Sequence, residues 1–224
     1  MGNPNITDRK LIFCRTLAEF PVRCLIAECD DCNRYFAACC VHSSFGAELC
    51  NEDQTTCHHI QLVFVDGACS NNGRDNARSG LGITVGYDKD LSWSIPVDEE
   101  MDPYAARTNQ RAELLAAIEG LKKLHEIDLD VRSYIESNDD STYILATDSE
   151  YVVKGITEWF PRWKRRNWRT ADGKRPANLD LFLKLDEYTA SLERERVAVG
   201  FWHVPRTHNQ EADELAKLAA AEYP

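Results

Sequence analysis

The strongest constraint on the fold is an alternation of strand and helix patterns after residue 60. Apolar, β-rich runs occupy residues 61–69, 81–87 and 91–97 with turn residues between them, which predicts an antiparallel meander. Two further apolar runs, at 142–149 and 197–205, alternate with helical patterns. Strands that alternate with helices in this way predict an α/β fold in which helices cover a mixed sheet.

Helices are expected at four places in the same part of the chain. In the first of them, Leu114, Ala117 and Ile118 fall on one stripe that would face the sheet. Pro161 is expected to end the second, because proline cannot donate a backbone hydrogen bond inside a helix. The expected helices are residues 108–125, 149–160, 178–193 and 211–222.

Four carboxylates occupy positions that these elements would point inward: Asp66, Glu113, Asp148 and Asp213. Taken singly, each has a simpler explanation; Asp148 would cap the helix that follows it, and Glu113 would face a helix dipole. Gathered in one place, four carboxylates would repel and raise one another's pKa values. A divalent cation removes that repulsion, so the joint pattern predicts a carboxylate cage for magnesium, a metal that usually faces phosphate.

The cysteines divide the chain into two parts. All nine except Cys69 precede residue 58, so we place a Cys-rich extension at residues 1–60 and the main domain at 61–224. Cys29 and Cys32 form a Cys-x-x-Cys pair and are the expected ligands of a structural zinc ion. Free thiols and disulfides are the alternatives. No secretory signal is recognisable, which favours an intracellular location, with nucleus, cytoplasm and mitochondrion left open.

The net charge of −11 taken alone argues against nucleic-acid binding, but the charge is unevenly distributed. Seven basic residues and one acid lie between Arg162 and Arg175, interleaved with Trp163 and Trp168. A local positive field matters more to a phosphate backbone than the total charge does.

No apolar run is long enough to predict a membrane span.

Residues 61–222 resemble a type 1 ribonuclease H of the eukaryotic kind. The resemblance rests on FVDGACSNNGR, TNQRAELLAAI, TDSEYVVKGITEW and NQEADELA, which occur in the family's order. It implies the ribonuclease H-like fold, with a five-stranded mixed sheet flanked by helices. It also implies endonucleolytic hydrolysis of the RNA strand in RNA/DNA hybrids by a two-magnesium mechanism, in which manganese is expected to substitute.

The resemblance also assigns roles to single residues. Asp66 would bridge both metal ions. Glu113 and Asp148 would hold the ion at the leaving oxygen, and Asp213 the ion that activates water. Members of the family commonly carry a loop histidine ten residues before the last carboxylate. His203 has that spacing but lies in a strand pattern, so we favour His208, in the loop, for any such role.

Contacts to the hybrid are implied in the same way. Telling RNA from DNA requires contacts to the 2′-hydroxyl, which short polar side chains can make. The DNA strand would meet an aromatic surface and a pair of residues that grips one phosphate, with Arg107 as a nearby helper that departs by one position from the family pattern. The residues expected to contact the hybrid are Cys69, Ser70, Asn72, Asn109 and Gln110 on the polar side, Tyr151, Trp159 and Trp163 on the aromatic side, and Thr108 and Asn178 at the phosphate.

Three alternatives stay open at this point. The first is another nuclease or integrase-type enzyme on the same fold. The second is a binding module without catalysis. The third is a zinc-organised nucleic-acid or protein interaction module with a secondary nuclease activity. The sequence does not indicate a protein partner or an oligomeric state.

Overall fold

A computed structural model describes residues 6–38, 58–72, 74, 76–134 and 141–222. The five strands expected in the main domain are present and form a mixed sheet. β5 pairs antiparallel with β6, and β6 antiparallel with β7, whereas β5, β8 and β9 run parallel. The expected fold class is therefore confirmed. The bounds are β5 Ile60–Ser70, β6 Arg78–Thr84, β7 Ser92–Pro96, β8 Thr142–Thr147 and β9 Ala198–His203.

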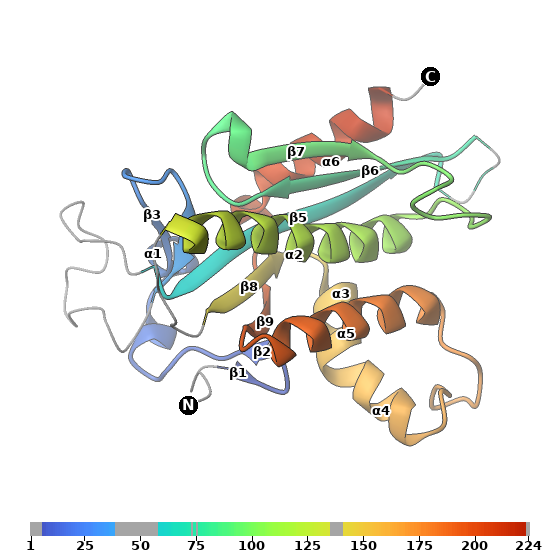
Figure 1. Ribbon diagram of the computed structural model, residues 1–224. Helices are drawn as coiled ribbons and strands as arrows, with labels where there is room; N and C mark the ends of the chain where they lie inside the picture. Colours follow the sequence, from blue (N-terminus) through green and yellow to red (C-terminus); the bar gives the residue numbers. More distant parts are fainter. Residues whose placement is uncertain (1–5, 39–57, 73, 75, 135–140, 223–224) are drawn as a thin grey trace.

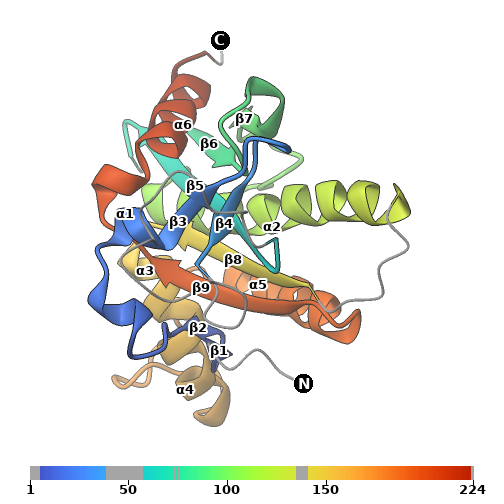
Figure 2. The same ribbon diagram turned by 90° about the vertical axis from the view of Figure 1, so that its left-hand side faces the viewer.

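The N-terminal extension adds four short strands to this sheet. β2 pairs in parallel with β9 through Lys10 and Phe201, and β4 pairs antiparallel with β5 through Phe36 and Gln61. The described part of the extension therefore continues the main sheet on both sides of its centre (Figure 2). Its elements are β1 Ile6–Thr7, β2 Lys10–Leu11, the 3₁₀ turn Leu17–Glu19, α1 Val22–Leu25, β3 Ile26–Glu28 and β4 Tyr35–Ala37.

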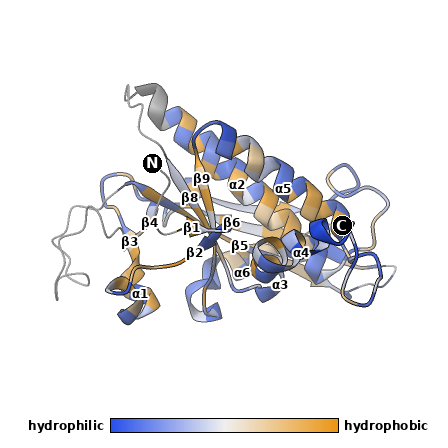
Figure 3. Cartoon of the chain, turned by 90° about the horizontal axis from the view of Figure 1, so that it is seen from below, coloured by the Kyte–Doolittle hydropathy of each residue, from blue (hydrophilic) through white to orange (hydrophobic). Residues whose placement is uncertain are grey.

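Helices cover both faces of the sheet (Figures 1 and 2). α2 (Asn109–Tyr134) and α5 (Leu179–Arg194) lie together on one face, and α6 (Gln210–Glu222) packs on the other against β5, β6 and β7. Hydrophobic and hydrophilic residues alternate along α2 and α5, as expected for amphipathic helices (Figure 3). Within the described ranges, no helix has both the length and the apolar character needed to cross a membrane.

Two hydrophobic clusters fill the two sides of the sheet. Because side chains alternate along a strand, Val63 and Val65 of β5 join the cluster under α2 and α5, while Leu62 and Phe64 join the opposite one. The extension supplies much of the second cluster, including the fully buried Leu17. Burying a leucine side chain contributes about 1.5–3 kcal/mol, so the extension stabilises the sheet as well as widening it.

The expectation that Pro161 ends a helix is wrong. α3 (Glu150–Lys154) continues through a π-helical segment, Gly155–Trp159, into α4 (Phe160–Arg165). Pro161 lies in the first turn of α4, where a missing backbone N–H costs little. The π segment shifts the hydrogen-bond ladder just before the proline, which lets the chain stay helical through it.

Candidate active site

The four predicted carboxylates line one cavity of about 390 Å³. Asp66 lies in the second half of β5, and Asp148 follows β8 directly. Glu113 lies in the first turns of α2, and Asp213 in the first turn of α6. Four segments that are distant in the sequence therefore converge at one end of the sheet.

Two glycines allow helices on opposite faces to approach β5 and β6 closely. A Cβ atom at Gly67 would stand 2.2 Å from the backbone nitrogen of Glu113, and one at Gly82 would stand 1.9 Å from the carbonyl oxygen of Ala212. Such distances are far below van der Waals contact, so any larger residue would push α2 or α6 away. Gly67 and Gly82 thus bring Glu113 and Asp213 to Asp66.

Neighbouring side chains hold two of the carboxylates in place. Ser149 donates its hydroxyl to Oε2 of Glu113 at 2.6 Å. The amide nitrogen of Asn209 donates to Oδ1 of Asp148 at 2.8 Å and to the carbonyl oxygen of Val65 at 3.0 Å. Sequence reasoning did not single out Ser149 or Asn209, although each lies in a motif that carries a carboxylate.

The electrostatics of the cavity favour a cation. Burial, followed by the charges of Asp148 and Asp213, raises the pKa of Asp66 to about 7. Burial also raises the pKa of Glu113, against the hydrogen bond from Ser149. Carboxylate oxygens are the ligands that Mg²⁺ and Mn²⁺ prefer, so the donor set fits a divalent cation of this kind.

In the loop before α6, the side chain that lies near the carboxylates is not that of His208, the residue expected there. His208 lines a separate cavity of about 220 Å³, and His203 contacts the backbone carbonyl of Asp148 at 3.2 Å through Nε2. The carboxylate cavity is lined instead by Arg206 and Lys217, which both form ion pairs with Asp213. The structure therefore does not bring His208 to the site, and its expected role gains no support from geometry.

Comparison with known proteins identifies the family. Residues 58–221 match the RNase H family. This chain belongs to the RNase H family. It is 33% identical over 163 residues to ribonuclease H1 of Mus musculus, covering 71% of this chain and 50% of that protein. It is 35% identical over 170 residues to the ribonuclease H of Thiobacillus denitrificans, covering 73% and 97%.

The chain thus spans about half the length of the mouse and rat ribonuclease H1 proteins. Among solved structures, the foamy viral protease-reverse transcriptase in complex with RNA/DNA hybrid aligns with a TM-score of 0.53 and 18% identity, covering 81% of this chain and 24% of that one. At that identity the likeness shows a shared RNase H fold alone.

Most of the polar residues expected to contact a hybrid lie beside the carboxylates of this RNase H domain. Cys69, Ser70 and Asn109 line the same cavity. The backbone nitrogen of Asn109 donates to Oδ1 of Asn72 at 3.1 Å, which joins the loop after β5 to the start of α2. Gln110 is exposed in the first turn of α2. Cys69, Ser70, Asn72 and Asn109 therefore form one polar rim beside the carboxylates, and Gln110 is next to Asn109 in the chain.

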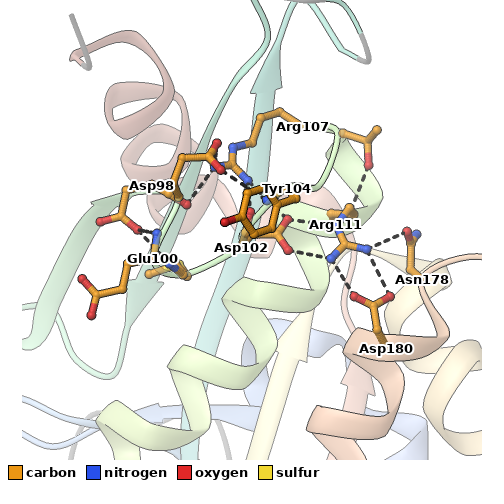
Figure 4. A network of polar contacts seen from close by, with 11 residues as sticks. Asp98, Glu100, Asp102, Tyr104, Arg107, Arg111, Asn178 and Asp180 are labelled. Carbon is orange, nitrogen blue, oxygen red and sulfur yellow. Dashed lines mark hydrogen bonds and ion pairs between the residues drawn. The ribbon is translucent and has the colours of Figure 1, made fainter.

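Thr108 and Asn178, the expected phosphate pair, are linked through Arg111. Figure 4 shows Arg111 between Asp102, Asn178 and Asp180. The backbone nitrogen of Arg111 donates to the Thr108 hydroxyl at 3.3 Å, and its guanidinium contacts Oδ1 of Asn178 at 3.4 Å. Asp102 and Asp180 hold the same guanidinium, at 2.6 and 2.7 Å. Sequence reasoning missed Arg111, because a tertiary network gives it this position.

Arg107, the suggested helper at the phosphate, is engaged elsewhere. Its guanidinium donates to the backbone carbonyls of Asp98 and Asp102 at 2.7 and 2.8 Å and pairs with Glu99 at 3.0 Å (Figure 4). Its side chain is only 11% exposed. Arg107 therefore fixes the loop ahead of α2, and the geometry does not support a phosphate contact.

The aromatic residues expected to face DNA form a continuous, partly exposed surface. The ring centroids of Tyr151 and Trp159 are 5.8 Å apart, and those of Trp159 and Trp163 are 6.3 Å apart. Trp163 also packs on Phe182 of α5 at 5.3 Å. Trp168, which packs on Phe160 at 5.3 Å, has a packing role in keeping with the simpler explanation of a tryptophan beneath a loop.

In the extension, Cys29, Cys32 and His58 form a group able to hold a metal ion. Nε2 of His58 lies 3.1 Å from the sulfur of Cys29 and 4.0 Å from that of Cys32, and the imidazole stacks on Phe36. Both thiols are free, whereas Cys24 is disulfide-bonded. His58 was not chosen from sequence, because nothing in the irregular spacing shows that it meets the Cys-x-x-Cys pair.

Proposed function

We propose that this protein is a magnesium-dependent endonuclease that hydrolyses the RNA strand of RNA/DNA hybrids. The observation that carries the proposal is the convergence of Asp66, Glu113, Asp148 and Asp213 in one cavity of an RNase H domain. All four acids of the family pattern are present, which disfavours a binding module without catalysis. RNase H relatives of bacterial origin that the chain covers almost completely support the same activity.

In this proposal the protein supplies position and charge. Two bound magnesium ions would lower the pKa of the attacking water and neutralise charge on the attacking and leaving oxygens. The charges of Asp148 and Asp213 both act on Asp66, which supports Asp66 as the carboxylate that both ions would share. Ser149 and Asn209 keep Glu113 and Asp148 turned toward the cavity.

Specificity for a hybrid would come from two surfaces on either side of the carboxylates. The rim of Cys69, Ser70, Asn72 and Asn109, together with the exposed Gln110, would read 2′-hydroxyls in the minor groove. The aromatic surface of Tyr151, Trp159 and Trp163, with Thr108 and Asn178, would hold the DNA strand.

The direct test is cleavage of end-labelled RNA/DNA hybrid, double-stranded RNA and double-stranded DNA, each with Mg²⁺ or with chelator. We expect cutting of the RNA in the hybrid alone, and only with Mg²⁺ or Mn²⁺. Equal cutting of all three substrates would contradict hybrid specificity and favour a different nuclease on this fold.

Neutralising the basic cluster should weaken hybrid binding and reduce its dependence on salt. Lys164, Arg165 and Arg166 are exposed at the end of α4. If all three contact phosphates, replacing them with alanine should lower the slope of log K against log salt by about 2–3. Binding is measured by fluorescence anisotropy with the Asp148→Asn variant as background, to prevent cleavage.

A matched control is the triple replacement of Lys89, Lys184 and Arg194, which removes the same charge from exposed positions outside the cluster. This control should leave the salt slope within about 0.5 of its original value. Equal slopes for the two triple variants would show that total charge, and not the cluster, governs binding.

We also propose that Cys29 and Cys32, with His58, bind a structural zinc ion. Thiolate and imidazole are the usual ligands of such sites, and burial lowers the pKa of His58, which keeps its ring neutral as a ligand must be. The two cysteines lie in the turn between β3 and β4, and His58 leads into β5. A zinc ion would therefore tie the β3–β4 hairpin to the strand that carries Asp66.

Removing this site should abolish zinc binding and destabilise the protein. We expect about one zinc ion per chain in the parent protein and none after Cys29→Ser with Cys32→Ser. The melting temperature should fall by about 3 °C or more, since 1 kcal/mol corresponds to about 2–4 °C at this size. Cys14→Ser, another free thiol, is the control that should keep the metal. The zinc content is measured by metal analysis of protein purified without chelator. A parent protein that contains no metal would refute the proposed zinc site.

An intracellular location is also a proposal, which rests on the sequence alone. A zinc-organised interaction module is the alternative function, and the cleavage test distinguishes it, because such a module does not require Mg²⁺-dependent hydrolysis.

A further inference from the structure

Arg206 reaches the carboxylate cavity from outside the elements that carry the four acids. It begins the 3₁₀ turn Arg206–His208, between β9 and α6. Its guanidinium forms an ion pair with Oδ1 of Asp213, and the side chain lines the cavity together with Asp66 and Asp148. Lys217 also pairs with Asp213, but that contact lies within α6, between residues four apart.

The backbone of Arg206 is fixed while its side chain is free to move. The turn is closed by hydrogen bonds from His208 to the carbonyl of Pro205 at 2.8 Å and from Asn209 to that of Arg206 at 3.0 Å. Asn209 in turn holds Asp148 and β5. The Arg206 side chain is 67% exposed, against 12% for Asp213, so the arginine is the partner that can leave the pair.

Charge balance gives Arg206 a second partner. Two divalent cations would neutralise four carboxylates, so further positive charge for the phosphodiester would come from Arg206 and Lys217, which both line the cavity. A scissile phosphate brings one negative charge, and more develops as the attacking oxygen bonds to phosphorus. A guanidinium stays positive at neutral pH, so Arg206 can offer its charge to either partner. Arginine also matches phosphate geometry with paired donors.

We propose that Arg206 is a phosphate-binding residue of the active site. It pairs with Asp213 when no divalent cation is bound, and it turns to the RNA phosphate when a cation takes Asp213. The inference rests on the proposed function, and it assigns to Arg206 the place in the loop that sequence reasoning gave to His208.

The proposal predicts opposite effects of one substitution on metal binding and on catalysis. Arg206→Ala removes a competitor of the cation, so Mg²⁺ should bind the protein without nucleic acid about 3–10-fold more tightly, measured by calorimetry. The same variant should cleave hybrid with kcat reduced about 10²-fold at saturating Mg²⁺, and with a smaller change in KM. Arg206→Lys should bind Mg²⁺ as the parent does and recover part of kcat, since lysine keeps the charge without the paired donors.

Arg194→Ala is the matched control, an exposed arginine on α5 that should change neither quantity. A purely structural Arg206 would give an Arg206→Ala variant with lower stability and unchanged kcat, and that result would overturn the proposal. Unchanged Mg²⁺ affinity would overturn the competition for Asp213. If the parent protein cleaved no hybrid, the proposed function itself would fail, and the calorimetry would still decide whether Arg206 competes with the cation.

Discussion

Asp148→Asn is expected to reduce the rate of hybrid cleavage by at least about 10²–10³-fold, with little change in stability. The substitution is isosteric, and an asparagine oxygen can still accept the hydrogen bond from Asn209 that Oδ1 of Asp148 accepts at 2.8 Å. What it removes is one negative charge of the metal cage. The measurement is single-turnover cleavage of labelled hybrid at saturating Mg²⁺.

Asp90→Asn provides the control for this experiment, because Asp90 is an exposed carboxylate in the short turn before β7. It should cleave at the parent rate. The Asp148 variant should keep the parent's circular dichroism spectrum and melting temperature. Full activity in a folded Asp148→Asn protein would remove Asp148 from the metal site, and with it the main support for the proposed function.

Asp66→Asn should stabilise the metal-free protein at pH 8 by up to about 4 kcal/mol. The pKa of Asp66 is about 7 in the folded protein, against an ordinary value of 3.8. Between these values the folded protein holds a proton that the unfolded chain releases. The contribution of Asp66 to stability is therefore fully present below about pH 4 and is lost as pH rises through 7. An asparagine carries no charge at any pH in this range, so the variant does not lose this part of the free energy of unfolding as pH rises.

Urea unfolding between pH 4 and 8 in the presence of chelator measures this effect. The two proteins should have similar free energies of unfolding near pH 4 and should diverge as pH rises. Magnesium should narrow the gap at pH 8, because it binds the folded parent protein more strongly than the variant. A stability difference that is independent of pH would show that Asp66 is not held among like charges, and Asp90→Asn should show no pH-dependent difference at all.

The central sheet and the four carboxylates followed from the sequence because local signals specify them. β5 and β8 read as apolar runs that end in Asp66 and Asp148, and the matching positions on α2 and α6 lie on packed faces. The order of motifs then placed all four at one end of the sheet. Periodicity of this kind survives in a single sequence, since it reflects burial that the strand or helix itself imposes.

Other features depend on contacts between distant segments and left no local signal. The strands of the extension are two or three residues long and are stabilised by pairing with β9 and β5. Such short strands show no periodic pattern in the sequence from which they could be predicted. His58 joins Cys29 only through that packing. His208 was preferred to His203 because the family commonly carries a histidine in this loop, whereas the geometry of the turn brings Arg206 to Asp213.

The way the sheet ends has a consequence for the behaviour of the protein at high concentration. Its outer strands are β1, β3 and β7, with two, three and five residues, and β7 terminates in Pro96. Long, flat outer strands offer unpaired backbone groups on which a neighbouring molecule can polymerise. The described sheet offers only brief stretches of that kind, so self-association by strand addition is disfavoured even though β5 at its centre is eleven residues long.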